Sequence, residues 1–292
     1  MRLVTYIDNA DITKTGLLNN DTVVPLEQLD ISNDMNEIIK DFQNVKKIIG
    51  ENKIESLTSL DKSDIKLLAP IPRPLRNIMC VGKNYHDHAQ EFYGSGFDSS
   101  GKKAVADFPV IFTKATTSVI ATDENIILAN DYTNTTDYEG ELGLILSKGG
   151  KNIKPEDAYD YIFGYTIIND VSARNIQKQH EQWFIGKSPD TYCPMGPAVI
   201  TADEITDINA VKLETYVNEE KRQTGIVKDM VFNIPFLIET LTKSMTLVEG
   251  DIIATGTPSG VGIGFDPPKF LKSGDKVKIT IDPIGTLENE VI

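Results

Sequence analysis

The sequence predicts a mostly β protein with some α-helix, in which a small N-terminal α+β domain precedes a larger β-rich one. From Val110 onward, short segments rich in Ile, Val and Leu recur between turns of Gly, Pro, Asn and Asp, which is the pattern of successive strands. Three prolines stand between Pro70 and Pro74, and they cannot continue a helix or a central strand. Because so stiff a segment marks a boundary in a chain of 292 residues, we expect domains at residues 1–69 and 70–292.

The individual elements follow from hydrophobic spacing and turn residues. Residues 3–7 alternate as a strand does, residues 35–49 carry apolar side chains at helical spacing, and residues 77–81 form a short apolar strand. Further helical segments are expected at residues 84–92, 173–184 and 234–244. The Gly- and Ser-rich tract after the first of these helices offers little apolar surface, so we expect it to be mobile.

Composition excludes several classes of partner. The formal net charge is -14 without a long Lys/Arg run, so a polyanion would be repelled and no nucleic acid is expected to bind. Cys80 and Cys193 are the two cysteines, and their spacing favours neither a disulfide framework nor a zinc site. Asp8 interrupts any apolar leader, and no segment approaches membrane-spanning length, so we expect a cytoplasmic protein without a membrane partner.

Two acidic residues share one face of a predicted strand. Within residues 137–146, alternation places Glu139 and Glu141 on one face, while Leu142 and Leu144 lie on the other. Neighbouring like charges are unfavourable in a half-buried sheet unless a cation lies between them. The alternative is an exposed edge strand whose acids are simply solvated.

A third acid follows the strand-like run of residues 165–169. Asp170 stands where that run gives way to a helical segment, which is a suitable place for a metal ligand. Three oxygen donors without a nearby Cys or His favour a hard ion, Mg²⁺ or Mn²⁺, over zinc. The alternative is that Asp170 caps the helix or belongs to a turn.

A histidine and a glutamate share one helical face at residues 84–92. His88 and Glu91 are three residues apart, and a carboxylate beside an imidazole raises its basicity and fixes its orientation. Such a pair suits a general base. The alternative is an exposed helix on which the two side chains meet by accident.

Two glycine-containing segments invite a phosphate-loop or dinucleotide interpretation. Gly186-Lys187-Ser188 lacks the required upstream glycine, because Glu181 stands there. Residues 256–264 do not keep the Gly-x-Gly-x-x-Gly spacing, because Phe265 occupies the last position. Lys187 is then either an electrophilic cation or a surface lysine. Residues 256–264 form either a turn whose backbone can approach a small anion or an ordinary tight turn.

Taken in order, these segments resemble the fumarylacetoacetate hydrolase family over residues 70–292. The segments that carry the resemblance are Tyr138–Gly143, Asn169–Arg174, Lys187–Ser188 with Asp190–Pro197, and Gly250–Gly262. The resemblance implies a mixed β-roll and a homodimer. It also implies catalytic His88, Glu91 and Lys187, substrate contacts from Arg174, Gln177 and Thr257, and a Mg²⁺ or Mn²⁺ held by Glu139, Glu141 and Asp170.

The implied activity is metal-dependent chemistry on a small 2-oxo acid. The two reactions expected first are C–C bond hydrolysis of an acylpyruvate and decarboxylation of oxaloacetate, and the sequence does not choose between them. Alternatives are an isomerase or hydratase of unsaturated 2-oxo diacids and a member of the family that binds metal and ligand without turnover. We further expect residues 85–108 to form a lid that orders when the acid binds, because a short polar helix followed by a Gly- and Ser-rich tract has little apolar surface to hold it down.

Overall fold

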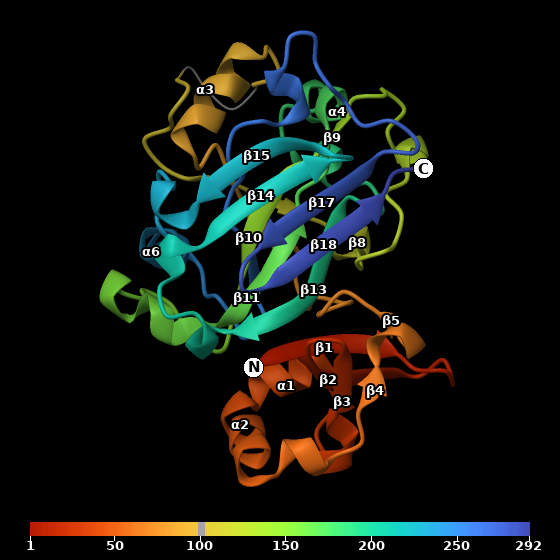
Figure 1. Cartoon of the computed structure of the whole chain (residues 1–292). Coiled ribbons are helices and arrows are strands. Elements are labelled where there is room, and N and C mark those ends of the chain that lie inside the picture. The colour runs from red at the N-terminus through yellow and green to blue at the C-terminus, as the bar shows by residue number, and fades with distance from the viewer. Residues whose placement is uncertain (99–102) are drawn as a thin grey trace.

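The computed structural model describes residues 1–98 and 103–292, and these form a mostly β protein (Figure 1). The predicted fold class is confirmed. The strands belong to a twelve-stranded sheet, a four-stranded sheet and a pair formed by β9 and β12. The bounds of the strands are β1 Arg2–Ile7, β2 Thr13–Asn19, β3 Thr22–Pro25, β4 Leu60–Asp61, β5 Lys66–Leu67, β6 Ile78–Gly82, β7 Val110–Lys114, β8 Val119–Ile120, β9 Thr136–Asp137, β10 Gly140–Leu146, β11 Ile162–Asn169, β12 Ser172–Ala173, β13 Cys193–Thr201, β14 Lys212–Val217, β15 Glu220–Ile226, β16 Ile252–Ala254, β17 Lys276–Ile281 and β18 Gly285–Glu290.

The two main sheets pack face to face. The larger one runs in the order β4-β3-β2-β1-β13-β11-β10-β16-β6-β7, with β5 on β1 and β8 on β13, and the smaller one runs β15-β14-β17-β18. In Figure 1 the smaller sheet lies in front of β10 and β11, and buried side chains of both sheets share one hydrophobic cluster. Strands β10, β11 and β13 are therefore buried on both faces along their whole lengths.

The N-terminal segment joins the same large sheet. Strand β1 pairs with β13, so the sheet continues across the predicted boundary at residue 70. The expected helical region at residues 35–49 is confirmed as two helices, α1 (Met35–Lys40) and α2 (Phe42–Glu51), which share a hydrophobic cluster with β11 and β13. Phe42 packs edge-on against Phe163 of β11, with 4.7 Å between ring centroids. The division into domains at residues 1–69 and 70–292 stays a prediction.

The remaining helices are short. They are α3 (His86–Gly94), α4 (Arg174–Gln179), α5 (Phe184–Lys187) and α6 (Ile234–Ser244). The helix expected at residues 173–184 is broken, because Glu181 adopts a left-handed backbone conformation with φ 56° and turns the chain between α4 and α5. A Cβ on Gly186 would lie 2.4 Å from the backbone nitrogen of Gln177, so that glycine allows α5 to pack on α4. Every helix in the described part of the chain is too short or too polar to cross a bilayer.

Candidate metal centre and active site

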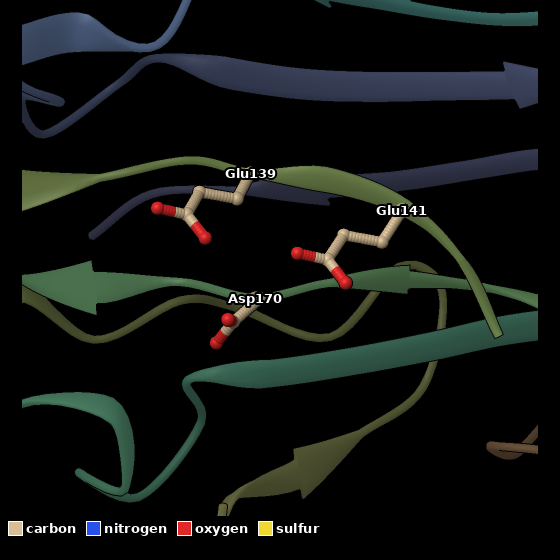
Figure 2. Close-up of side chains that lie close together, drawn as sticks. All are labelled: Glu139, Glu141 and Asp170. Carbon is tan, nitrogen blue, oxygen red and sulfur yellow. The ribbon is translucent and has the colours of Figure 1, made fainter. Parts of the chain in front are cut away.

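Strand register brings the three predicted acids together. In the antiparallel pair of β10 and β11, Gly140 lies opposite Asn169, so Glu139 and Asp170 are neighbours just beyond the strand ends. The backbone amide of Asp170 donates to the carbonyl of Glu139 at 2.8 Å and fixes this arrangement. Each of Glu139, Glu141 and Asp170 offers a carboxylate oxygen, and these oxygens lie within 4.8 Å of one another (Figure 2).

Burial decides between the interpretations of these acids. Glu139, Glu141 and Asp170 are 5%, 1% and 0% exposed, so the exposed edge strand with solvated acids is wrong. The helix-cap alternative for Asp170 is wrong as well, because α4 begins after Ala173 and has no side-chain cap. Buried carboxylates need paired charges, so the groups around them determine the chemistry of the cluster.

Buried cations surround the acids. Lys187 donates from Nζ to Glu139 Oε2 and to Asp170 Oδ2, both at 2.7 Å. Arg174 lies 2.7 Å from Glu139 Oε1 and 2.9 Å from Asp137 Oδ2. Four acids and three bases meet in this cluster: Asp137, Glu139, Glu141 and Asp170, with Lys114, Arg174 and Lys187. With all seven groups ionised, the cluster carries one net negative charge.

The pKa values of the two glutamates move in opposite directions. Burial would raise the pKa of Glu139, but the ammonium of Lys187 and the guanidinium of Arg174 outweigh it and hold that pKa below its usual range. Burial raises the pKa of Glu141 well above its usual range, and the charges of Asp170 and Glu139 raise it further. Glu141 therefore lacks a cation of its own, and a divalent ion beside it would supply one.

The predicted dyad is formed and buried. His88 Nδ1 lies 3.1 Å from Glu91 Oε2, and the other carboxylate oxygen of Glu91 accepts from the amide of Gly260 at 2.9 Å. His88 is 3% exposed, so the exposed-helix alternative is wrong. With Nδ1 engaged by Glu91, Nε2 is the ring nitrogen available for a substrate.

Helix α3 is held down by apolar contacts, contrary to the reasoning behind the predicted lid. Phe92 is 2% exposed and packs edge-on against Trp183, with 5.6 Å between ring centroids, in a cluster that includes Val261 and Ile263. The premise that this helix lacks apolar surface is therefore wrong. Of the predicted lid at residues 85–108, residues 99–102 lie outside the described part of the chain.

The glycine-rich segment binds carboxylates of the protein itself. The amide of Gly256 donates to Glu141 Oε2 at 2.7 Å, the amide of Gly260 donates to Glu91, and the amide of Gly262 donates to Asp137 Oδ1 at 2.6 Å. One loop therefore fixes three carboxylates: that of Glu141 in the candidate metal cluster formed by Glu139, Glu141 and Asp170, that of Glu91 in the dyad, and that of Asp137, which pairs with Arg174.

The predicted substrate contacts lie around one small pocket. The pocket is lined by all three of them, Arg174, Gln177 and Thr257, together with the predicted catalytic residues His88 and Lys187 and two of the acids. Thr257 donates its hydroxyl proton to the carbonyl of Gly140 at 2.9 Å and accepts from Gln223 at 2.7 Å. The free space is about 10 Å³, roughly what one water molecule needs, so a four-carbon acid can enter only if a wall moves outward.

The sequence reasoning missed several buried charged groups of this site. Lys114 is fully buried, lies 2.7 Å from Asp170 Oδ1 and donates to the carbonyl of Val171 at 3.0 Å. Asp137 precedes the recognised motif directly, and Lys83 precedes the dyad segment. The sequence does carry one sign of Lys114: this lysine ends the apolar strand of residues 110–114.

The fold and the site define a mixed β-roll protein with a buried cluster of carboxylates that could hold a metal. The family described as fumarylacetoacetate (FAA) hydrolase C-terminal matches residues 77–292. The chain belongs to this family of enzymes, as its motifs predicted.

Individual relatives support the assignment. Oxaloacetate tautomerase YisK of Bacillus subtilis (strain 168) is 55% identical over 229 residues, which are 78% of this chain and 74% of that protein. The fumarylacetoacetate hydrolase of the psychrophile Exiguobacterium antarcticum has a structure similar to this one with a TM-score of 0.84 at 36% identity, covering 100% of this chain and 99% of that one. Maleylpyruvate hydrolase from Sphingobium sp. SYK-6, solved with manganese(II) and pyruvate, has a TM-score of 0.81 at 27% identity, with the same coverage.

Proposed function

We propose that this chain is a divalent-metal-dependent enzyme that interconverts the keto and enol forms of oxaloacetate. The observation that carries the proposal is one pocket lined both by acids of the metal cluster and by the His88 imidazole. The 55% identity to an oxaloacetate tautomerase supports this choice of reaction among those open to a small 2-oxo acid.

We propose Glu139, Glu141 and Asp170 as the ligands of one Mg²⁺ or Mn²⁺. The cluster fits such an ion because its donors are all oxygen atoms, because they converge within 4.8 Å, and because Glu141 lacks a cation of its own. When bound, the ion supplies Lewis acidity at the carboxylate and the 2-oxo oxygen of the substrate.

The proton movement is assigned to the dyad. In the keto-to-enol direction, His88 Nε2 takes a proton from C3 of oxaloacetate, the C3–H electron pair forms the C2–C3 double bond, and the 2-oxo oxygen gains the charge. The His88 imidazolium then gives its proton to that oxygen, which forms the enol and restores the neutral imidazole, and the reverse sequence returns the keto form. Glu91 holds the imidazole through Nδ1 at 3.1 Å and stabilises the imidazolium that forms.

Two other features of the pocket support this chemistry. Lys187 Nζ, buried beside Glu139 and Asp170, would place a positive charge near the 2-oxo oxygen as negative charge develops there. Arg174 and Gln177 would orient the acid. The aromatic walls formed by Phe92, Phe112 and Trp183 would exclude water, which strengthens every charge interaction in the pocket.

A second candidate is hydrolysis of the C–C bond of an acylpyruvate. It is favoured by the structural similarity to the Sphingobium maleylpyruvate hydrolase, whose structure holds manganese(II) and pyruvate. In that reaction, His88 would take a proton from water, and the hydroxide would attack the distal carbonyl carbon. The bond between that carbon and C3 would then break, and the departing pyruvate enolate would take the proton back from the His88 imidazolium. Decarboxylation of oxaloacetate uses the same binding mode. The homodimer and the cytoplasmic location stay predictions.

The test is a direct comparison of these reactions. Purified protein with Mg²⁺, Mn²⁺ or a chelator is mixed with enol-oxaloacetate, and ultraviolet absorbance follows the enol while coupled assays follow pyruvate release from oxaloacetate and from acylpyruvates. We expect metal-dependent loss of the enol that is faster than pyruvate release, abolished in Glu141→Gln and kept in the exposed control Glu156→Gln. A protein that releases pyruvate from an acylpyruvate and leaves the enol unaffected would contradict the tautomerase proposal.

A further inference from the structure

Besides Lys187, a second lysine lines the pocket, and it lies outside the metal cluster. Lys83 follows β6, lines the pocket and is 4% exposed. Its backbone is left-handed, with φ 58°, which is strained for a residue with a side chain and persists only where the surroundings enforce it. On the C-terminal side, Asn84 holds the backbone of Lys83 in place, because the side chain of Asn84 is hydrogen-bonded to Thr255 and Phe232 at 2.7 to 3.0 Å.

The neighbouring glycine fixes the other side. A Cβ on Gly82 would lie 2.4 Å from a ring carbon of Trp183, so glycine allows the indole to pack directly on the backbone before Lys83. Gly82 and Asn84 therefore fix the position of Lys83, and its strained backbone conformation places the ammonium group at the pocket.

The partners of Lys83 set it apart from the other cations of the pocket. Arg174 and Lys187 are both paired with Glu139 of the metal cluster. Lys83 Nζ instead donates to Asp98 Oδ2 at 2.9 Å and to the backbone carbonyl of Lys103 at 3.1 Å. Among the described residues that line the pocket, Lys83 is the cation whose hydrogen-bond partners, Asp98 and the carbonyl of Lys103, both lie outside the metal cluster.

We infer that Lys83 is the receptor for the second carboxylate of a 2-oxo dicarboxylic acid. The inference rests on the proposed function, because it takes the metal cluster to hold the end of the substrate that carries the 2-oxo group. A buried ammonium must stay paired, and the distal carboxylate of a diacid can replace the carboxylate of Asp98. A monocarboxylic acid offers no such replacement, so Lys83 selects diacids.

Replacement of Asp98 by the distal carboxylate of the substrate also explains why the pocket has little free space. Lys83 and Asp98 stay together while the pocket is closed, and an entering diacid takes the place of Asp98 on the ammonium. Displacement of Asp98 therefore accompanies the opening that a four-carbon acid requires. The side chain of Asp98 is buried and paired with Lys83, so a ligand that displaces Asp98 must bring a second negative charge to the ammonium.

The test compares binding of malate with binding of lactate. These stable 2-hydroxy acids have the same metal-chelating end and differ by one carboxylate. Titration calorimetry of the Mn²⁺-loaded protein should show that wild type prefers malate, and that Lys83→Met lowers malate affinity about ten- to a hundredfold while lactate affinity stays the same. Mn²⁺ affinity and Tm of each variant report whether the site and the fold are intact.

Asp98→Asn is the matched control, because it breaks the same ion pair from the other side. A purely structural pair predicts that both variants behave alike, whereas a receptor predicts that Asp98→Asn keeps or strengthens the preference for malate. The inference is overturned if Lys83→Met retains the preference, if it weakens both ligands equally, or if Asp98→Asn loses the preference as Lys83→Met does. Absence of tautomerase activity with this binding pattern intact would contradict the proposed function alone.

Discussion

Gly264 controls the position of the dyad carboxylate, and Gly264→Ala should uncouple catalysis from folding. An added Cβ would lie 1.8 Å from Glu91 Oε1 and 2.2 Å from its Cδ. Because ordinary contact begins at 3.4 Å, the carboxylate must retreat by about 1.6 Å. The flexible side chain of Glu91 can do so at little cost to the fold, but its hydrogen bonds to His88 and Gly260, now 3.1 and 2.9 Å, cannot both survive.

The expected cost falls on turnover. General acid–base catalysis contributes about 10²- to 10⁴-fold, and loss of the orienting carboxylate should remove part of it, about 10- to 100-fold in kcat, or roughly 1.4 to 2.7 kcal/mol. The assay is metal-dependent loss of enol-oxaloacetate, with Mn²⁺ affinity by calorimetry and Tm as controls. Gly94→Ala is the matched variant, because a Cβ there meets nothing within 4 Å.

Two outcomes would refute this reasoning. Wild-type turnover in Gly264→Ala would show that the orientation of Glu91 does not matter for the reaction. Equal losses of turnover and of Mn²⁺ binding would show that the substitution disturbs the whole site, so that Gly264 has no specific role in positioning the dyad.

Three further predictions concern the dyad, the metal ligands and α3. His88→Ala should lower kcat about 10²- to 10⁴-fold with unchanged Mn²⁺ affinity, while the exposed neighbour His86→Ala should match wild type; equal activity of both would remove the dyad from the mechanism. Because the pKa of Glu141 is raised, its carboxyl group stays protonated at pH values above the usual pKa of 4.5, and Mn²⁺ must displace that proton to bind. The affinity for Mn²⁺ should therefore rise with pH until the pH passes the raised pKa. Calorimetry in buffers of different ionisation heat measures the proton release, and a pH-independent affinity would contradict it. Oxalate with Mg²⁺ should slow amide hydrogen exchange across α3, whereas identical exchange in both states would exclude ordering of this helix by ligand.

Much of the site follows from local patterns in the sequence. Alternation around Glu139 and Glu141 correctly predicts that they share one face, and the spacing of His88 and Glu91 correctly predicts their contact. These predictions succeed because each depends on one short local segment, the residues at the start of β10 or helix α3, whose periodicity is fixed by backbone geometry. The motif around Asp170 adds the third acid, and the register of β10 and β11 then brings it to the other two.

The missed features depend on contacts between distant segments. Lys114 meets Asp170 across 55 intervening sequence positions, from an edge strand whose partner in the sheet cannot be read from periodicity. The approach of Gly264 to Glu91 depends on how the glycine-rich loop crosses α3. The premise about α3 failed for the same reason, because the apolar surface that holds Phe92 comes from Trp183 and residues 261–263.

The most direct test of the central claim is the location of bound manganese. Crystals grown with Mn²⁺ should show one anomalous-scattering peak, with an oxygen from each of Glu139, Glu141 and Asp170 at about 2.0 to 2.3 Å. That result would place the ion in the pocket lined by His88 and Lys187, where the proposed chemistry requires it. A peak held by other residues in a protein with Mn²⁺-dependent activity would contradict the account.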